Sequence, residues 1–187
     1  NNNSINNLSK KIKTPIIEHK RYIGGRYSAL SEVGMIPAHL MGLKLINFRK
    51  NLLDYFKSKK KKLLADSVSK ISEIYLSKKI NSIVFLSYSS QLSEFAYWCQ
   101  QLIAESLGKK GKGLMPIVSV GPKDHHSLLQ LYLDGPRDKM FCILSTKNLY
   151  NFKIGENYLN GKFNFLKNKK LDKIISSQKN AFIETLK

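Results

Sequence analysis

The chain has 187 residues, 42% of them apolar, which is enough for one folded domain with a core of its own. It carries 32 Lys and Arg against 13 Asp and Glu, for a net charge of +19. No run of 18 apolar residues occurs, so the sequence excludes a membrane-spanning helix. Residues 1–15 have neither the apolar core of a signal peptide nor the arginine-rich pattern of a transit peptide. We expect a cytoplasmic protein without a membrane partner.

The positive charge favours a nucleic-acid partner in general, but its distribution argues against one here. The lysines are spread along the chain, with runs at 57–62 and 167–170 that are typical of solvated helix faces. Asn, Ile, Lys and Ser are abundant and Arg is scarce, a bias that AT-rich coding sequence imposes on any surface. We expect no nucleic-acid partner, and small anionic substrates would benefit from the charge as well. The alternative, a nucleic-acid binder, would show steeply salt-dependent binding.

Residues 1–15 are polar and low in complexity, and we expect a poorly ordered segment there, followed by one domain over residues 16–187. A helical pattern covers Ser28–Lys44, and its Gly34 and Pro37 predict a kinked or two-piece helix. Two further helices are predicted between residues 46 and 78.

Three short apolar runs predict buried strands. They are Ser82–Ser87, Met115–Gly121 and Lys139–Ser145. Helical patterns follow the first two runs, and a last helix is predicted over Leu171–Leu186. The alternation predicts an α/β fold with a parallel sheet flanked by helices. Ligands of such folds bind at the carboxyl ends of the strands, where residues 88–90, expected to cap the next helix, and residues 121–126 fall.

The helix before Glu105 has one apolar stripe at helical spacing, formed by Leu92, Phe95, Ala96, Cys99, Leu102 and Ile103. Trp98, Gln101 and Glu105 share a different stripe, because residues three and four apart lie on one face. Glu105 is therefore predicted to point away from the core of its own helix. The loop Gly108–Gly113 follows and can contact phosphate through its amides and lysines, although it lacks the spacing of a P-loop.

Three other features bear on chemistry. His125 and His126 stand near a helix N-terminus, where the dipole disfavours imidazolium and allows a neutral proton shuttle; a pair of partly exposed polar residues is the alternative. Gly24 and Gly25 precede Arg26, which indicates either backbone held close to a ligand or a simple turn. A carboxylate, a histidine and an arginine together can move a proton between adjacent carbons of a sugar.

The two cysteines, Cys99 and Cys142, have no CxxC or Cys/His spacing beside them. We expect reduced thiols in the core, no disulfide and no metal site.

Three motifs in the same order resemble the glucose-6-phosphate isomerase family. Ile23–Gly34 (IGGRYSALSEVG) resembles its Gly-Gly-Arg-Phe/Tyr-Ser signature, and Trp98–Gly113 (WCQQLIAESLGKKGKG) resembles its Gln-x-x-x-Glu-Ser-x-Gly-Lys segment. Gly121–Pro136 (GPKDHHSLLQLYLDGP) is similar to its Asp-Gln-His-Ser segment, with His125 in place of the usual Gln. The resemblance is strong over residues 16–138 and thinner to the end.

The resemblance implies an aldose–ketose isomerase of glycolysis and gluconeogenesis, free of metal and cofactor. Such an enzyme interconverts glucose 6-phosphate and fructose 6-phosphate through a cis-enediolate. By matching position Glu105 would be the base, His126 would assist ring opening and Arg26 would stabilise the enediolate. The implied substrate-binding residues are Gly24, Gly25 and Gln101.

The family fold consists of two sugar-isomerase (SIS) domains, and residues 16–187 would hold most of the second, incomplete at both ends. The resemblance also implies a homodimer in which His126 reaches the neighbouring subunit's site. The family's phosphate-binding loops and its late lysine signature have no counterpart here, so we expect an internal or C-terminal-half fragment that is inactive alone. The alternative is a non-catalytic sugar-phosphate-binding domain of the same fold, which would need no base such as Glu105.

Overall fold

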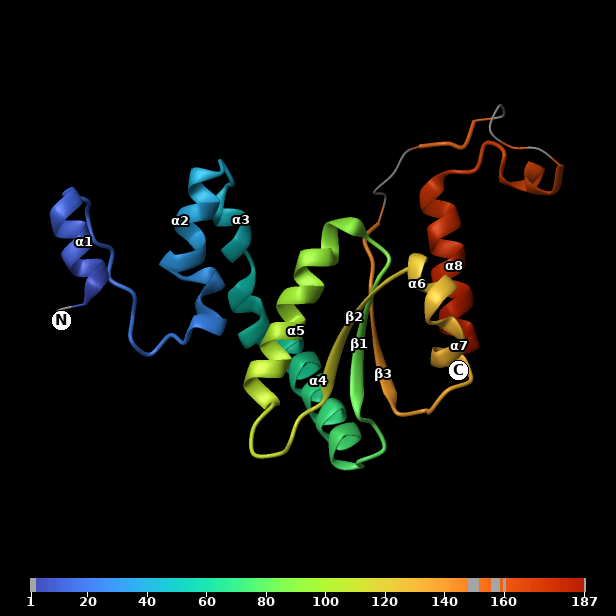
Figure 1. The fold of residues 1–187 in the computed structure, drawn as a ribbon, viewed down its shortest axis with the longest axis horizontal. Coiled ribbons are helices and arrows are strands. Elements are labelled where there is room, and N and C mark those ends of the chain that lie inside the picture. Colours follow the sequence, from blue (N-terminus) through green and yellow to red (C-terminus); the bar gives the residue numbers. More distant parts are fainter. Residues whose placement is uncertain (1–2, 148–151, 156–158, 160, 187) are drawn as a thin grey trace. The chain divides into compact units, whose positions relative to one another are not determined.

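The structure, a computed structural model, describes residues 3–147, 152–155, 159 and 161–186 (Figure 1). By its internal contacts the chain divides into two units, residues 1–67 and 68–187. The division falls inside one long helix, α4 (Ser58–Leu76). Each unit is described below by itself.

The second unit is built on a parallel sheet of three strands in the order β2-β1-β3. The strands are β1 (Ser82–Ser87), β2 (Met115–Val120) and β3 (Lys139–Leu144). Every residue of the central strand is buried, as a continuous apolar run predicts for a strand covered on both faces. The predicted α/β fold with a parallel sheet flanked by helices is therefore confirmed.

Helices cover both faces of this sheet (Figure 1). Alternate residues of β1 enter different cores: Val84 and Leu86 pack against Phe182, whereas Ile83 and Phe85 pack around Ala96. Figure 1 shows α5 on one face and α6, α7 and α8 on the other. The helical segments of the unit after α4 are η3 (Ser90–Leu92), α5 (Ser93–Leu107), α6 (Lys123–Ser127), α7 (Leu129–Leu133), η5 (Gly161–Leu166) and α8 (Leu171–Thr185).

Two details of the helices differ from the prediction. The cap of α5 is Leu92, which makes no side-chain cap hydrogen bond, and the short turn η3, which begins at Ser90, separates Tyr88 and Ser89 from the helix. The single helix predicted after β2 is two short helices that meet at Leu128, whose backbone (φ −124°, ψ −8°) leaves helical geometry. The histidine pair therefore lies on a helix of five residues, α6.

The first unit consists of short helical segments without a strand among residues 3–67. They are α1 (Ser4–Ile12), η1 (Gly25–Leu30), α2 (Glu32–Leu40), α3 (Leu45–Arg49) and η2 (Leu52–Phe56). The break in the predicted Ser28–Lys44 helix falls at Ser31, whose hydroxyl accepts a hydrogen bond from the Val33 amide (3.4 Å). Gly34 and Pro37, where the break was predicted, both lie within α2.

Helix α1 lies within residues 1–15, where a poorly ordered segment is predicted, and that expectation stays a prediction. Asn3 caps this helix by accepting a hydrogen bond from the Asn6 amide (2.8 Å), and Lys13 ends it in the left-handed region (φ 54°). Good capping at both ends explains why a polar sequence is helical here. The boundary predicted between residues 15 and 16 stays a prediction.

Candidate functional site

The Gly-Gly-Arg segment begins η1 in the first unit. The hydroxyl of Ser28 donates to the carbonyl of Gly25 (2.7 Å), so the turn is held by a serine as one of the two sequence interpretations proposed. A Cβ on Gly25 would meet nothing within 4 Å, and one on Gly24 would meet only Tyr27 at an ordinary 3.7 Å. Neither glycine has a positive φ. The described chain itself therefore does not require glycine at these two positions.

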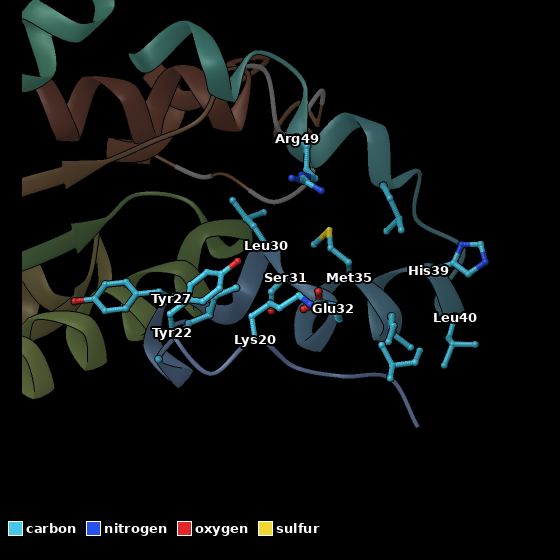
Figure 2. Close-up of a pocket in the computed structure, with 15 residues that line it drawn as sticks. Lys20, Tyr22, Tyr27, Leu30, Ser31, Glu32, Met35, His39, Leu40 and Arg49 are labelled. Atoms are coloured by element: carbon cyan, nitrogen blue, oxygen red, sulfur yellow. The ribbon is translucent and has the colours of Figure 1, made fainter. Parts of the chain in front are cut away.

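A pocket of about 890 Å³ lies beside this segment within the first unit (Figure 2). Gly24 contributes to its wall, and the side chains of Lys20, Glu32 and Met35 gather at its middle. Glu32 lies 3.7 Å from the imidazole of His19, and a backbone hydrogen bond holds the pKa of this carboxyl below its ordinary value. The volume is in the range of small-molecule sites.

Glu105 lies on the exposed face of α5, as the helical spacing predicted. The side-chain amide of Gln101, one turn earlier, donates to the Glu105 carboxylate (Nε2 to Oε1, 2.9 Å), which orients that carboxylate. The side chain of Gln100 donates to the carbonyl of Pro116 at the start of β2 (2.9 Å). The last turns of α5 are thereby fixed beside the edge where the strands begin, called here the amino edge.

The Gly/Lys loop after Glu105 is a tight hairpin at the same edge. A bridge pairs Lys109 with Lys112, and the amide of Gly113 donates to the phenol oxygen of Tyr75 (3.2 Å). A Cβ on Gly108 would lie 2.5 Å from the carbonyl oxygen of Ala104, so this glycine permits the sharp exit from the helix. The loop is thus shaped by packing, and its lysines are exposed beside Glu105.

The opposite edge, where the strands end and which we call the carboxyl edge, carries the histidine pair on α6. Asp124 ties this helix to the end of β2 because its Oδ2 accepts from the Val120 amide (2.7 Å) and the Ser119 hydroxyl (2.8 Å). His125 is half-buried, whereas His126 is exposed. The two adjacent imidazoles therefore have different surroundings.

His125 makes a close side-chain contact at the carboxyl edge. Its Nε2 lies 2.6 Å from the hydroxyl of Tyr88, the residue that follows β1, and its ring stacks on Phe182 of α8 (centroids 5.5 Å apart). Burial lowers the pKa of His125 below its ordinary value of 6.5, although nearby Asp124 opposes this shift. Burial also raises the pKa of Tyr88 to about 12. At neutral pH the contact therefore joins an uncharged phenol to an uncharged imidazole.

Glu105 and His126 lie at opposite edges of one sheet. The chain passes from Gln100, level with the start of β2, down α5 to Glu105, whereas His126 follows the far end of β2. Helical and strand rises put them on the order of 20 Å apart along the strands. Within one chain these two predicted residues are not brought together. Arg26, Gly24 and Gly25 belong to the first unit.

Sequence reasoning did not single out Tyr88 and Phe182 as partners of the histidine pair. Tyr88 falls among the residues 88–90 expected to cap a helix, and Phe182 lies within the helix predicted over Leu171–Leu186. The available signal was an aromatic residue directly after a fully buried strand, at the ligand-binding end of the sheet.

Both cysteines are free and half-buried. Burial raises the pKa of both thiols, and the proximity of Cys142 adds to the shift of Cys99. Among the residues that the structure describes, no His, Cys, Asp and Glu side chains gather in a way that could hold a metal ion. The described helices include none with the length and apolar character needed to cross a membrane.

Comparison with known proteins finds long matches to curated enzymes. The glucose-6-phosphate isomerase of Mycoplasmopsis synoviae is 34% identical over 173 residues, which is 87% of this chain. That of Campylobacter jejuni is 39% identical over 134 residues, 67% of this chain. This chain belongs to the glucose-6-phosphate isomerase family. No family model matches it.

The chain spans 39% of the length of the Mycoplasmopsis glucose-6-phosphate isomerase and 32% of the Campylobacter enzyme. These shares are consistent with the expectation of a partial chain. A hypothetical protein of Thermus thermophilus has a crystal structure that matches the fold with a TM-score of 0.82 at 26% identity, over 98% of this chain and 46% of that one. The resemblance first noted in three motifs of the glucose-6-phosphate isomerase family thus extends over most of the sequence.

Proposed function

We propose that this chain carries the proton-transfer residues of a cytoplasmic glucose-6-phosphate isomerase. Glu105 moves a proton between C1 and C2 of the sugar through a cis-enediolate, His126 assists ring opening, and Arg26 stabilises the enediolate oxygen. This chemistry needs neither a metal nor a cofactor. The activity is proposed for a polypeptide of the family's length, called here the full-length isomerase. It would serve glycolysis in one direction of the reaction and gluconeogenesis in the other.

The observation that carries the proposal is the Gln101–Glu105 pair on an open helix face. A general base must reach the carbon-bound proton of its substrate, which a carboxylate turned into the core could not do. The carboxylate of Glu105 is exposed and oriented by an amide donor at 2.9 Å, within the segment that matches the isomerase relatives. Gln101 is proposed to contact the substrate near its phosphate as well.

The separation of Glu105 from His126 supports a homodimer. Both groups must touch one sugar, and a sugar phosphate is too short to bridge on the order of 20 Å between two edges of a sheet. A site that uses both therefore takes His126 from a second copy of the chain. In this proposal residues 16–187 form most of a second sugar-isomerase domain.

The two glycines of the first unit support a substrate-binding role for that segment. Because a Cβ on Gly25 would meet nothing in the described chain, its requirement for glycine would come from the substrate. We expect Gly25→Ala in the full-length isomerase to lower kcat/KM by roughly 10²-fold, since small displacements of a bound sugar have effects of this size. Its free energy of unfolding should be unchanged, and an unchanged kcat/KM would remove Gly24 and Gly25 from the site.

The proposed base is tested by Glu105→Gln in the full-length isomerase. Turnover should fall by roughly 10²–10⁴-fold with little change in substrate binding, because loss of a general base costs that much. The direct readout is exchange of the C2 proton of glucose 6-phosphate in deuterated water, which should stop. Glu94→Gln, which removes an exposed carboxylate from the first turn of the same helix, is the matched control and should exchange normally.

Exchange at the wild-type rate in Glu105→Gln would exclude Glu105 as the base. Binding of glucose 6-phosphate without any turnover in the unsubstituted full-length protein would favour the sugar-phosphate-binding domain instead. The 187-residue chain alone is expected to bind weakly and to be inactive, because the family's phosphate-binding loops find no counterpart in its sequence.

A further inference from the structure

His125, a position where the family usually has Gln, is built into the carboxyl edge by three elements. Its imidazole meets the edge of Tyr88 (centroids 5.6 Å apart, 74° between planes) and stacks on Phe182 (5.5 Å, 29°). The Tyr88 amide donates to the carbonyl of Leu144 at the end of β3 (2.8 Å), which fixes the backbone that carries the phenol. His125 therefore joins α6 to the ends of β1 and β3 and to α8.

Helix α6, which carries His125 and His126, is too short to be stable by itself. α6 has five residues, and isolated helices of that length are unstable. Its start is tied to β2 through Asp124, and its next residue is tied to Tyr88. Gly121 permits the second contact, since a Cβ there would lie 2.6–2.8 Å from three atoms of the Tyr88 ring.

Adjacent residues on a helix point about 100° apart, so anchoring one sets the direction of the other. We propose that Tyr88 and His125 are positioning residues, which fix α6 so that the exposed imidazole of His126 is presented to the neighbouring subunit's substrate. This inference rests on the proposed function of His126.

The groups that face His125 define how pH acts on it. The Tyr88 hydroxyl contacts Nε2 from the end of β1, Phe182 covers the ring from α8 and carries no charge, and the carboxylate of Asp124 lies on the same helix as His125. The phenol oxygen can donate to this nitrogen or accept from it, so a proton on the ring costs the solvation of the new charge and not the hydrogen bond itself. Because burial lowers the pKa of His125, a proton on the ring favours arrangements in which the imidazole leaves Tyr88 and Phe182 for solvent, so acid weakens the contact.

The test compares Tyr88→Phe, His125→Leu and His125→Gln in the full-length isomerase. The first two should lower kcat by about tenfold and leave KM within about twofold, because they displace His126 without touching the substrate. His125→Gln should restore most of kcat, since its amide oxygen can accept from the phenol. In the wild type kcat should fall as His125 takes up a proton. His125→Gln has no such group, so the acid limb of its pH profile should lie at lower pH.

Tyr132→Phe is the matched control, because it removes a phenol from the same aromatic cluster without touching His125. Its kcat should be that of the wild type. An equal loss of kcat in Tyr132→Phe, an unchanged kcat in Tyr88→Phe, or an unmoved acid limb in His125→Gln would each overturn the positioning role.

Hydrogen exchange of the Leu128 amide, which donates to the Asp124 carbonyl across α6 (2.7 Å), separates this inference from the proposed function. Tyr88→Phe should speed this exchange by about tenfold, because the helix loses one of its two anchors. Unchanged exchange would refute the anchoring even in an active enzyme. Faster exchange in a protein that does not isomerise glucose 6-phosphate would retain the anchoring and refute the function.

Discussion

The two edges of the sheet differ in how their functional side chains are held. At the amino edge Glu105 lies on an open helix face, where Gln101 orients it and it takes no part in the core. At the carboxyl edge His125 and Asp124 bond to buried residues, and His126 stands beside them. Substitutions of Glu105 should therefore change activity alone, whereas most substitutions at the carboxyl edge should change stability as well.

His126→Gln should have the largest effect on activity. Unlike most substitutions at the carboxyl edge, it should leave stability unchanged. His126 is exposed, so its loss should leave the free energy of unfolding within about 0.5 kcal/mol. Turnover of glucose 6-phosphate in the full-length isomerase should fall by roughly 10²–10⁴-fold, as for other lost acid–base groups. Steady-state kinetics and urea unfolding of one preparation measure both. A destabilised but active variant would reverse the roles given to the two histidines.

Gly121→Ala should destabilise the carboxyl edge most. The new methyl group would overlap three atoms of the buried Tyr88 ring, and overpacking of this kind costs about 1–3 kcal/mol. Urea unfolding of the 187-residue chain measures the change. Gly25→Ala is the control, because its Cβ would meet open space and should leave the midpoint where it is. Equal midpoints for both variants would show that the Tyr88 contact has no effect on stability.

Asp124→Ala should also destabilise the carboxyl edge. It removes two hydrogen bonds to a carboxylate, at 2.7 and 2.8 Å, and leaves the buried hydroxyl of Ser119 without that acceptor. A loss of about 1–3 kcal/mol is expected. At the amino edge the comparable change, Gln101→Ala, should be nearly silent in stability, since the pair it breaks is exposed. A larger loss for Gln101→Ala would contradict the contrast between the edges.

The smallest expected effect is a pH dependence confined to the carboxyl edge. The folded state holds His125 at a pKa below 6.5, so the unfolded state binds more protons as the solution becomes acidic. Stability from this residue is present above pH 6.5 and is lost as the pH falls through the folded pKa. His125→Gln should flatten that part of the stability curve, measured by urea unfolding from about pH 7.5 to about pH 5. An unchanged slope would mean that His125 is solvated in solution.

The sheet was predictable from sequence, and the reason lies in its burial. The predicted Ser82–Ser87 strand has the observed bounds, and the two outer strands each end one residue earlier than predicted. A short apolar run rich in β-branched residues is typical of a strand that is covered on both faces, so few other assignments were open. The position of Glu105 on an exposed stripe also followed directly from helical spacing.

The first unit was harder to predict because packing constrains it less. Among described residues 3–67, Ala38 is the only buried apolar side chain, while Leu40 and Ile46 are 80% and 77% exposed. The helices predicted between residues 46 and 78 became α3, η2 and α4, with boundaries set by local turns. The Tyr88–His125 contact joins residues 37 apart in sequence, and no local pattern reveals such a pair.

The central claim is that Glu105 and His126 of one chain serve two different sites. It is tested most directly by mixing Glu105→Gln and His126→Gln subunits of the full-length isomerase, after unfolding and refolding them together. Each variant alone should be inactive, but a mixed dimer would contain one site with both native residues. Random pairing should therefore restore about a quarter of the wild-type activity. Mixed dimers that form and remain as inactive as the separate variants would contradict the claim.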